Sequence, residues 1–168
     1  HSGEEQFRVL GVRALDEYQL PTDRIRGGDP VMLETLIRVP AGKSTNDLIL
    51  EFQIERMGGT TLWSARGDLP ADLPVADRSN RRAGDSEPDT RVARLGIEQL
   101  PIGAGQVRLI ATLYEASGVL VDRGESLLDI EPADQSQSGL LALRHHWDWD
   151  QTLSPSPSNT DDAPVGRR

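Results

Sequence analysis

The stretch Leu48-Ile49-Leu50-Glu51-Phe52-Gln53-Ile54-Glu55 decides the fold class. Apolar side chains recur at every second position from Leu48 to Ile54, and charged or amide side chains fill the positions from Glu51 to Glu55 between them. A β-strand points successive side chains to opposite faces, so this period of two predicts a strand with one face in a core. The other face is left to solvent or to a ligand.

The same alternation extends outward along the chain, through residues 7–14, 31–39 and 107–114. Gly58-Gly59 and Ser117-Gly118 each lie between two such segments, and glycine supplies the positive φ that tight hairpins need. No segment shows convincing helical periodicity. These features predict an all-β fold, an antiparallel β-sandwich of the immunoglobulin-like or jelly-roll-like kind with about eight strands.

The length of 168 residues suits one domain with a tail. After residue 150 the composition turns to Ser, Pro, Asn and Asp, which bury too little apolar surface to fold. We therefore expect a β-sandwich domain over residues 4–150 and a disordered tail over residues 151–168. The net charge of −9 argues against a nucleic-acid partner, because binding phosphates requires a basic surface.

Gly42-Lys43-Ser44-Thr45 resembles the end of a phosphate-binding P-loop, but the position that requires the first glycine of that motif holds Ile37. The sequence also lacks the G-x-S-x-G turn of serine hydrolases. Carboxylate pairs suited to glycoside cleavage are not excluded by spacing, since Asp and Glu are numerous, and most are expected to be surface charges. We expect no enzyme activity in this chain.

We expect no metal site and no cofactor. His145 and His146 are adjacent, and neighbouring residues on a strand point to opposite faces, so the two side chains do not converge on one ion. The chain has no cysteine. The long polar segment 67–89 contains Arg78, Arg81 and Arg82, which either bind an anionic group or are solvated and balanced by nearby acidic residues.

The few aromatic residues indicate a binding face. Phe7 and Phe52 are expected in the core, whereas strand parity predicts that Trp63 and Tyr114 face outward. An aromatic ring beside amide, carboxylate and guanidinium groups offers the stacking and planar hydrogen bonds that oligosaccharides need. Packing of Trp63 in a dimer contact or a loop is the open alternative. The expected carbohydrate-binding residues are Trp63, Tyr114, Gln53, Glu55, Arg94 and Arg108.

The order of these strands and turns resembles the C-terminal carbohydrate-binding domain of Wzt-type ATP-binding subunits, which serve ABC exporters of O-antigen polysaccharide. The resemblance covers about residues 4–150. It is carried by Phe7-Arg8-Val9, by Arg26-Gly27-Gly28-Asp29-Pro30-Val31, and most strongly by Ile97-Glu98-Gln99-Leu100-Pro101-Ile102 followed by Gly105-Gln106-Val107-Arg108-Leu109. Residues 139–147 are similar to the last strand of that family.

The resemblance implies a non-catalytic module that recognises the exported polysaccharide of the cell envelope and forms a homodimer by exchanging edge strands. It also implies attachment, through an ATPase domain that is not part of these residues, to a transmembrane exporter subunit at the cytoplasmic face of the inner membrane. The sequence contains no Walker motif that would make this chain the ATPase itself. The alternative is a sandwich that serves as a dimerisation or interaction module without a glycan site.

Overall fold

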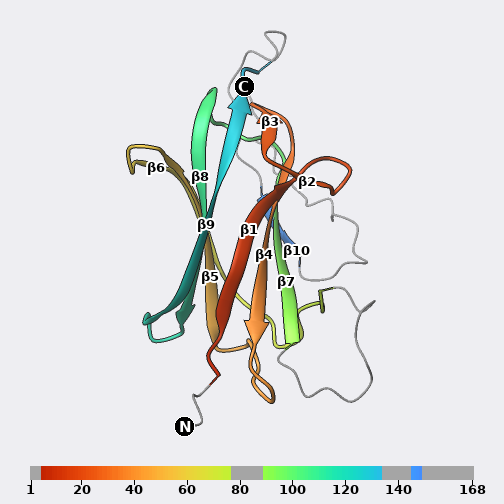
Figure 1. The fold of residues 1–168 in the computed structure, drawn as a ribbon, viewed down its shortest axis with the longest axis vertical. Helices are drawn as coiled ribbons and strands as arrows, with labels where there is room; N and C mark the ends of the chain where they lie inside the picture. The colour runs from red at the N-terminus through yellow and green to blue at the C-terminus, as the bar shows by residue number, and fades with distance from the viewer. Residues whose placement is uncertain (1–4, 77–88, 134–144, 149–168) are drawn as a thin grey trace, which may run out of the picture.

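The computed structural model describes residues 5–76 and 89–133 and the backbone of residues 145–148. In these ranges the chain forms no helix, and its ten strands make two five-stranded sheets that face each other (Figure 1). The predicted all-β sandwich is confirmed, with two short strands beyond the number expected. Every strand pair is antiparallel except β3 with β9, which is parallel.

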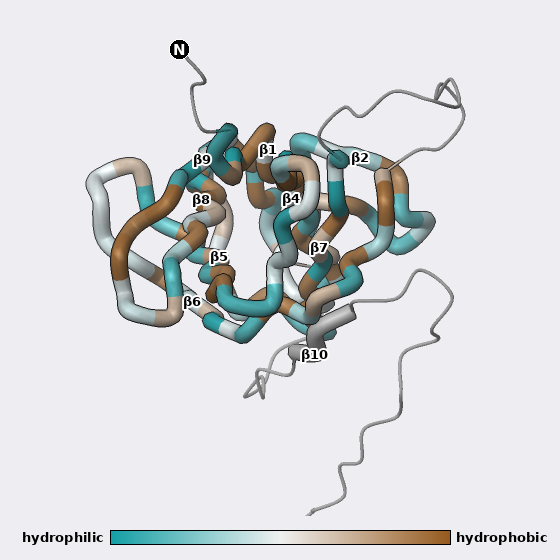
Figure 2. Tube along the Cα trace, turned by 90° about the horizontal axis from the view of Figure 1, so that it is seen from below, coloured by the Kyte–Doolittle hydropathy of each residue, from teal (hydrophilic) through white to brown (hydrophobic). Residues whose placement is uncertain are grey.

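The first sheet has the order β10-β7-β4-β1-β2, and the second has the order β3-β9-β8-β5-β6. Figure 2 shows the two layers from the side of the N-terminal segment. The strands of the first sheet are β1 (Arg8–Leu15), β2 (Pro21–Thr22), β4 (Val31–Val39), β7 (Asp89–Ile97) and β10 (His145–Asp148). The strands of the second sheet are β3 (Arg24–Arg26), β5 (Leu48–Arg56), β6 (Thr61–Asp68), β8 (Gly105–Glu115) and β9 (Leu120–Glu131).

The core lies between the sheets and is built by the alternation that the sequence shows. Leu50, Phe52 and Ile54 of β5 are fully buried, and Leu33 and Ile37 of β4 face them from the other layer. Phe52 therefore lies in the core, as expected. Each of these side chains contributes about 1.5–3 kcal/mol of transfer free energy on burial, which holds the layers together.

The sandwich closes along one side, where β1 passes over the inner face of β9. The hydroxyl of Ser126 donates a hydrogen bond to the Val12 carbonyl at 2.7 Å, and the backbone N–H of Val9 donates to the Asp122 carboxylate at 2.7 Å. A Cβ at Gly124 would lie 2.7 Å from Cγ1 of Val9, so any larger residue there would force Val9 to shift. Small and polar residues on β9 thus join the two sheets.

Trp63 faces the core, and the prediction that it faces outward is wrong. Ile54 pairs with Trp63, but the next pair is Glu55 with Thr61, so Leu62 is the extra residue of a β-bulge. The bulge shifts the parity of β6 by one and places Trp63 inward with 6% of its surface exposed. The prediction counted forward from an inward Leu62 to Trp63, and such counting cannot detect an inserted residue, because the bulge depends on pairing with β5.

Several expectations fall outside the described residues. The Arg78, Arg81 and Arg82 cluster, the tail over residues 151–168 and the side chains of His145 and His146 are among them. The long segment after β6 is described in its first part, where Leu69 and Leu73 are buried against the core.

Candidate functional site

The outer face of the second sheet is the candidate site, and strand register determines its layout. We define this outer face by the outward side chains of β5, β6, β8 and β9. Gln53 lies between Ser64 and Ile110 in the register, and Glu55 is paired with Arg108. The residues of the outer face are Glu51, Gln53, Glu55, Ser64, Arg66, Arg108, Ile110, Thr112, Tyr114, Arg123, Glu125 and Leu127.

Four of the predicted site residues lie on this outer face, and Tyr114 is six positions along β8 from Arg108. Gln53 and Glu55 project from β5, and Arg108 and Tyr114 project from the neighbouring strand β8. All four side chains are half-buried. Strand parity therefore predicted their placement correctly, whereas their role in binding stays a prediction.

Tyr114 belongs to a small cluster with two residues that sequence reasoning missed. The guanidinium carbon of Arg66 lies 4.8 Å from the centre of the Tyr114 ring, which is a cation–π contact. Nε of Arg66 donates to Oε2 of Glu51 at 3.2 Å, and the Tyr114 hydroxyl donates to Oε1 of Glu51 at 3.5 Å. The cluster holds the ring in place and covers one of its faces.

Some of the remaining polar side chains of the outer face form loose ion pairs with one another, and others form no hydrogen bond or ion pair within the described ranges. Arg108 and Arg123 lie 3.8 Å and 3.6 Å from the carboxylate of Glu125, which are loose ion pairs. The side chains of Gln53 and Glu55 make no hydrogen bond or ion pair with any other residue in the described ranges. Their amide and carboxylate groups thus retain hydrogen-bonding capacity for a ligand.

Arg94 does not belong to this group, and the prediction that it shares one outward sheet face with Gln53, Glu55 and Arg108 is wrong. It lies on β7 in the first sheet, where its Nε donates to Oε2 of Glu34 at 2.7 Å. Arg13 binds the other carboxylate oxygen of Glu34 at 2.6 Å from the neighbouring strand. Alternation along a single strand shows which residues share a face of that strand, but it does not show which sheet the strand joins.

Trp63 is also separated from the other predicted residues, since it lies on the inner side of the second sheet. Stacking of an exposed Trp63 ring on a sugar is therefore not part of this site. Strand parity could have placed Arg66 on the outer face, because it lies three residues after Trp63 and so on the opposite side of β6. That step requires Trp63 to be placed inward first, which depends on the bulge at Leu62.

The described ranges contain no cluster of three or more His, Asp or Glu side chains placed to hold a metal ion. None of the described segments is a helix long and apolar enough to cross a membrane.

The sequence matches no protein-family model and has no significant match among curated proteins. Among solved structures, one similar fold is the crystal structure of the C-terminal domain of Wzt, with a TM-score of 0.56 and 11% identity over 93% of this chain and 86% of that one. A CARDB domain from Pyrococcus furiosus, solved in complex with di-metal ions, matches with a TM-score of 0.44 and 11% identity over 76% of this chain and 92% of that one. The first likeness shows that this chain shares the fold of the C-terminal domain of Wzt.

Proposed function

We propose that this chain is a non-catalytic glycan-binding module that recognises the polysaccharide substrate of an ABC exporter on the outer face of its second sheet. The observation that carries the proposal is the grouping of Gln53, Glu55, Arg108 and Tyr114 on adjacent strands. The fold shared with the C-terminal domain of Wzt supports the same conclusion.

The chemistry of the outer face suits a sugar chain. A pyranose ring offers an apolar C–H face that stacks on an aromatic ring, and hydroxyl groups that bind planar polar side chains. Tyr114 would supply the stacking surface on the side of its ring that Arg66 leaves open. Farther along the same two strands, Gln53 would accept and donate hydrogen bonds, Glu55 would accept them, and Arg108 would donate them.

The proposed partners follow from the same reading. An open sheet face buries little of a ligand, so we expect each site to bind weakly and a homodimer to raise the avidity for a repeating polymer. The module would work beside an ATPase domain and a transmembrane exporter subunit at the cytoplasmic face of the membrane. Binding without catalysis is the role that such a module would have there.

Isothermal titration with the cell-surface polysaccharide of the source organism tests this proposal. We expect saturable binding by the wild-type chain and a loss of about tenfold or more in affinity for Arg108→Ala, because hydrogen bonds to charged groups contribute about 1.5–3 kcal/mol. Arg38→Ala is the matched control, since Arg38 is an exposed arginine on β4 of the other sheet.

Two results would contradict the proposal. Equal affinity in Arg108→Ala, Gln53→Ala and the Arg38→Ala control would discard this site. Absence of binding by the folded wild-type chain would favour the alternative, a dimerisation or interaction module without a glycan site, and sedimentation would then test its self-association.

A further inference from the structure

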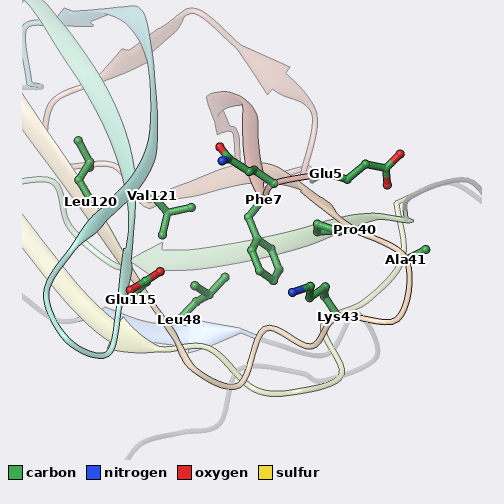
Figure 3. A pocket seen from close by; sticks show the side chains of 10 residues that line it. Glu5, Phe7, Pro40, Ala41, Lys43, Leu48, Glu115, Leu120 and Val121 are labelled. Atoms are coloured by element: carbon green, nitrogen blue, oxygen red, sulfur yellow. The ribbon is translucent and has the colours of Figure 1, made fainter. Parts of the chain in front are cut away.

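A pocket of about 530 Å³ opens at one end of the sandwich (Figure 3). Three separate segments of the chain form it: the N-terminal stretch before β1, the loop between β4 and β5, and the hairpin between β8 and β9. An adjoining hollow of about 500 Å³ continues from it and shares Phe7, Lys43, Leu48 and Glu115 as lining residues. These volumes fall within the range of small-ligand sites, about 300–1,000 Å³.

Part of the pocket wall is apolar. The Phe7 ring points into the space, and Leu48 and Val121 lie close to it in the view of Figure 3. Phe7, which the sequence predicted in the core, packs against the core but is only partly buried. Part of an aromatic ring is therefore open to an occupant, as sugar stacking requires.

The rim of the pocket is polar and carries more negative than positive charge. Lys43, the one lysine of the chain, and the carboxylates of Glu5 and Glu115 line the opening. Asp47 adds a further carboxylate in the adjoining hollow. Lys43 makes no ion pair within the described residues. An anionic occupant would meet two or three carboxylates and one ammonium group, so net repulsion is expected.

The pocket lies at the end of the second sheet at which Tyr114 is found. Tyr114 belongs to the outer face, and the next residue, Glu115, lines the pocket. Tyr114 is also paired with Leu120, which lines the pocket from β9 and is 57% exposed. Successive side chains of a strand point to opposite faces, so a chain bound at Tyr114 would reach the pocket by passing around the β8–β9 hairpin, past Leu120.

We propose that the pocket binds one uncharged or amine-bearing sugar unit of the polysaccharide and binds uronates more weakly. This inference rests on the proposed function and extends it, because it adds a second subsite and a charge selectivity that the outer face does not have. The outer face carries both Arg and Glu side chains, whereas carboxylates predominate at the pocket.

Amide chemical shifts of the ¹⁵N-labelled chain test the pocket alone, with methyl glucoside, glucosamine and glucuronate as probes. We expect saturable shifts for the first two probes at the amides of residues 5–7, 43–48 and 115–121. Glucuronate should bind about tenfold more weakly. The double variant Glu5→Gln and Glu115→Gln should remove most of that difference, because it removes the repelling charges. Neither residue is buried, so folding should be retained.

Phe7→Leu, which keeps apolar volume without an aromatic ring, should weaken methyl glucoside several-fold. Lys43→Ala removes the one ammonium group of the rim and should weaken glucuronate binding further, and Arg38→Ala on the other sheet is the control. Absence of shifts at these amides, or equal affinity for glucuronate and methyl glucoside, would overturn the inference. The proposed function would still hold after such a result if the wild-type chain bound the polysaccharide and Arg108→Ala weakened that binding. Loss of the proposed function would appear instead as absence of polysaccharide binding by the wild-type chain.

Discussion

The outer faces of the two sheets both carry arginine and glutamate side chains, but they use them differently. On the first sheet, Glu34 is 1% exposed, and both of its oxygens are bound by Arg13 and Arg94 at 2.6–2.7 Å. On the second sheet, Glu55 is half-exposed and unbound within the described residues, and the ion pair of Arg108 is 3.8 Å long.

The difference separates structural charges from charges that are available for recognition. A buried carboxylate must be paired, since an isolated one carries a large desolvation penalty. The Glu34 cluster therefore contributes to joining β1, β4 and β7 and has little capacity left for a ligand. The half-exposed groups of the second sheet carry no such penalty, so they can remain unpaired until a ligand binds.

The largest expected effect concerns Trp63, which lies on the inner side of the second sheet. Trp63→Ala should lower the free energy of unfolding by about 3–5 kcal/mol, because it leaves a cavity in the core. Urea denaturation measures this change, and Ser64→Ala, at the next position of β6 and facing outward, is the control. A Trp63→Ala chain with wild-type stability but reduced glycan affinity would show that the outer face includes Trp63 after all.

The contrast between the two glutamates is tested by Glu34→Ala and Glu55→Ala. Glu34→Ala should lower the free energy of unfolding by about 2–4 kcal/mol, since it leaves two arginines without their shared partner, partly relieved by solvent at Arg13. Glu55→Ala should change it by less than about 0.5 kcal/mol. Equal effects in urea denaturation would mean that the outer faces do not differ in this way.

A third pair of variants compares the two tyrosines of the chain. Tyr114→Ala should reduce polysaccharide affinity about threefold to tenfold, because aromatic contacts contribute about 0.5–1.5 kcal/mol. Tyr18, which is 74% exposed on the turn between β1 and β2, is the control. Titration of both variants should show wild-type affinity for Tyr18→Ala. The reverse order would move the site to the β1–β2 turn.

The smallest effect is expected for Arg66→Ala, which uncovers the ring of Tyr114. Loss of the cation–π contact should lower the free energy of unfolding by about 0.5–1 kcal/mol. The variant also shows what Arg66 does to glycan binding. Glycan affinity should increase if Arg66 only covers the ring, and it should decrease if Arg66 holds the ring in its orientation. Unchanged stability and unchanged affinity together would indicate that the cluster has no role in positioning Tyr114.

The alternation of residues 48–55 and of the other apolar segments was sufficient to determine the fold class. The same parity placed Gln53, Glu55, Arg108 and Tyr114 outward on their strands. These features are local: backbone geometry sends successive side chains to opposite faces, and burial of apolar surface selects the inner one. Any sheet that accepts these strands must place those residues in the same way.

Only the tertiary structure decided where Trp63, Arg94 and Phe7 lie. The bulge at Leu62 that turns Trp63 inward arises from pairing between β5 and β6, and the sheet that receives Arg94 depends on β7 pairing with β4. The end pocket likewise forms from segments more than a hundred residues apart in the chain, Phe7 and Val121 among them. Such long-range arrangements depend on how whole strands pack, and a pattern with a period of two residues carries no information about them.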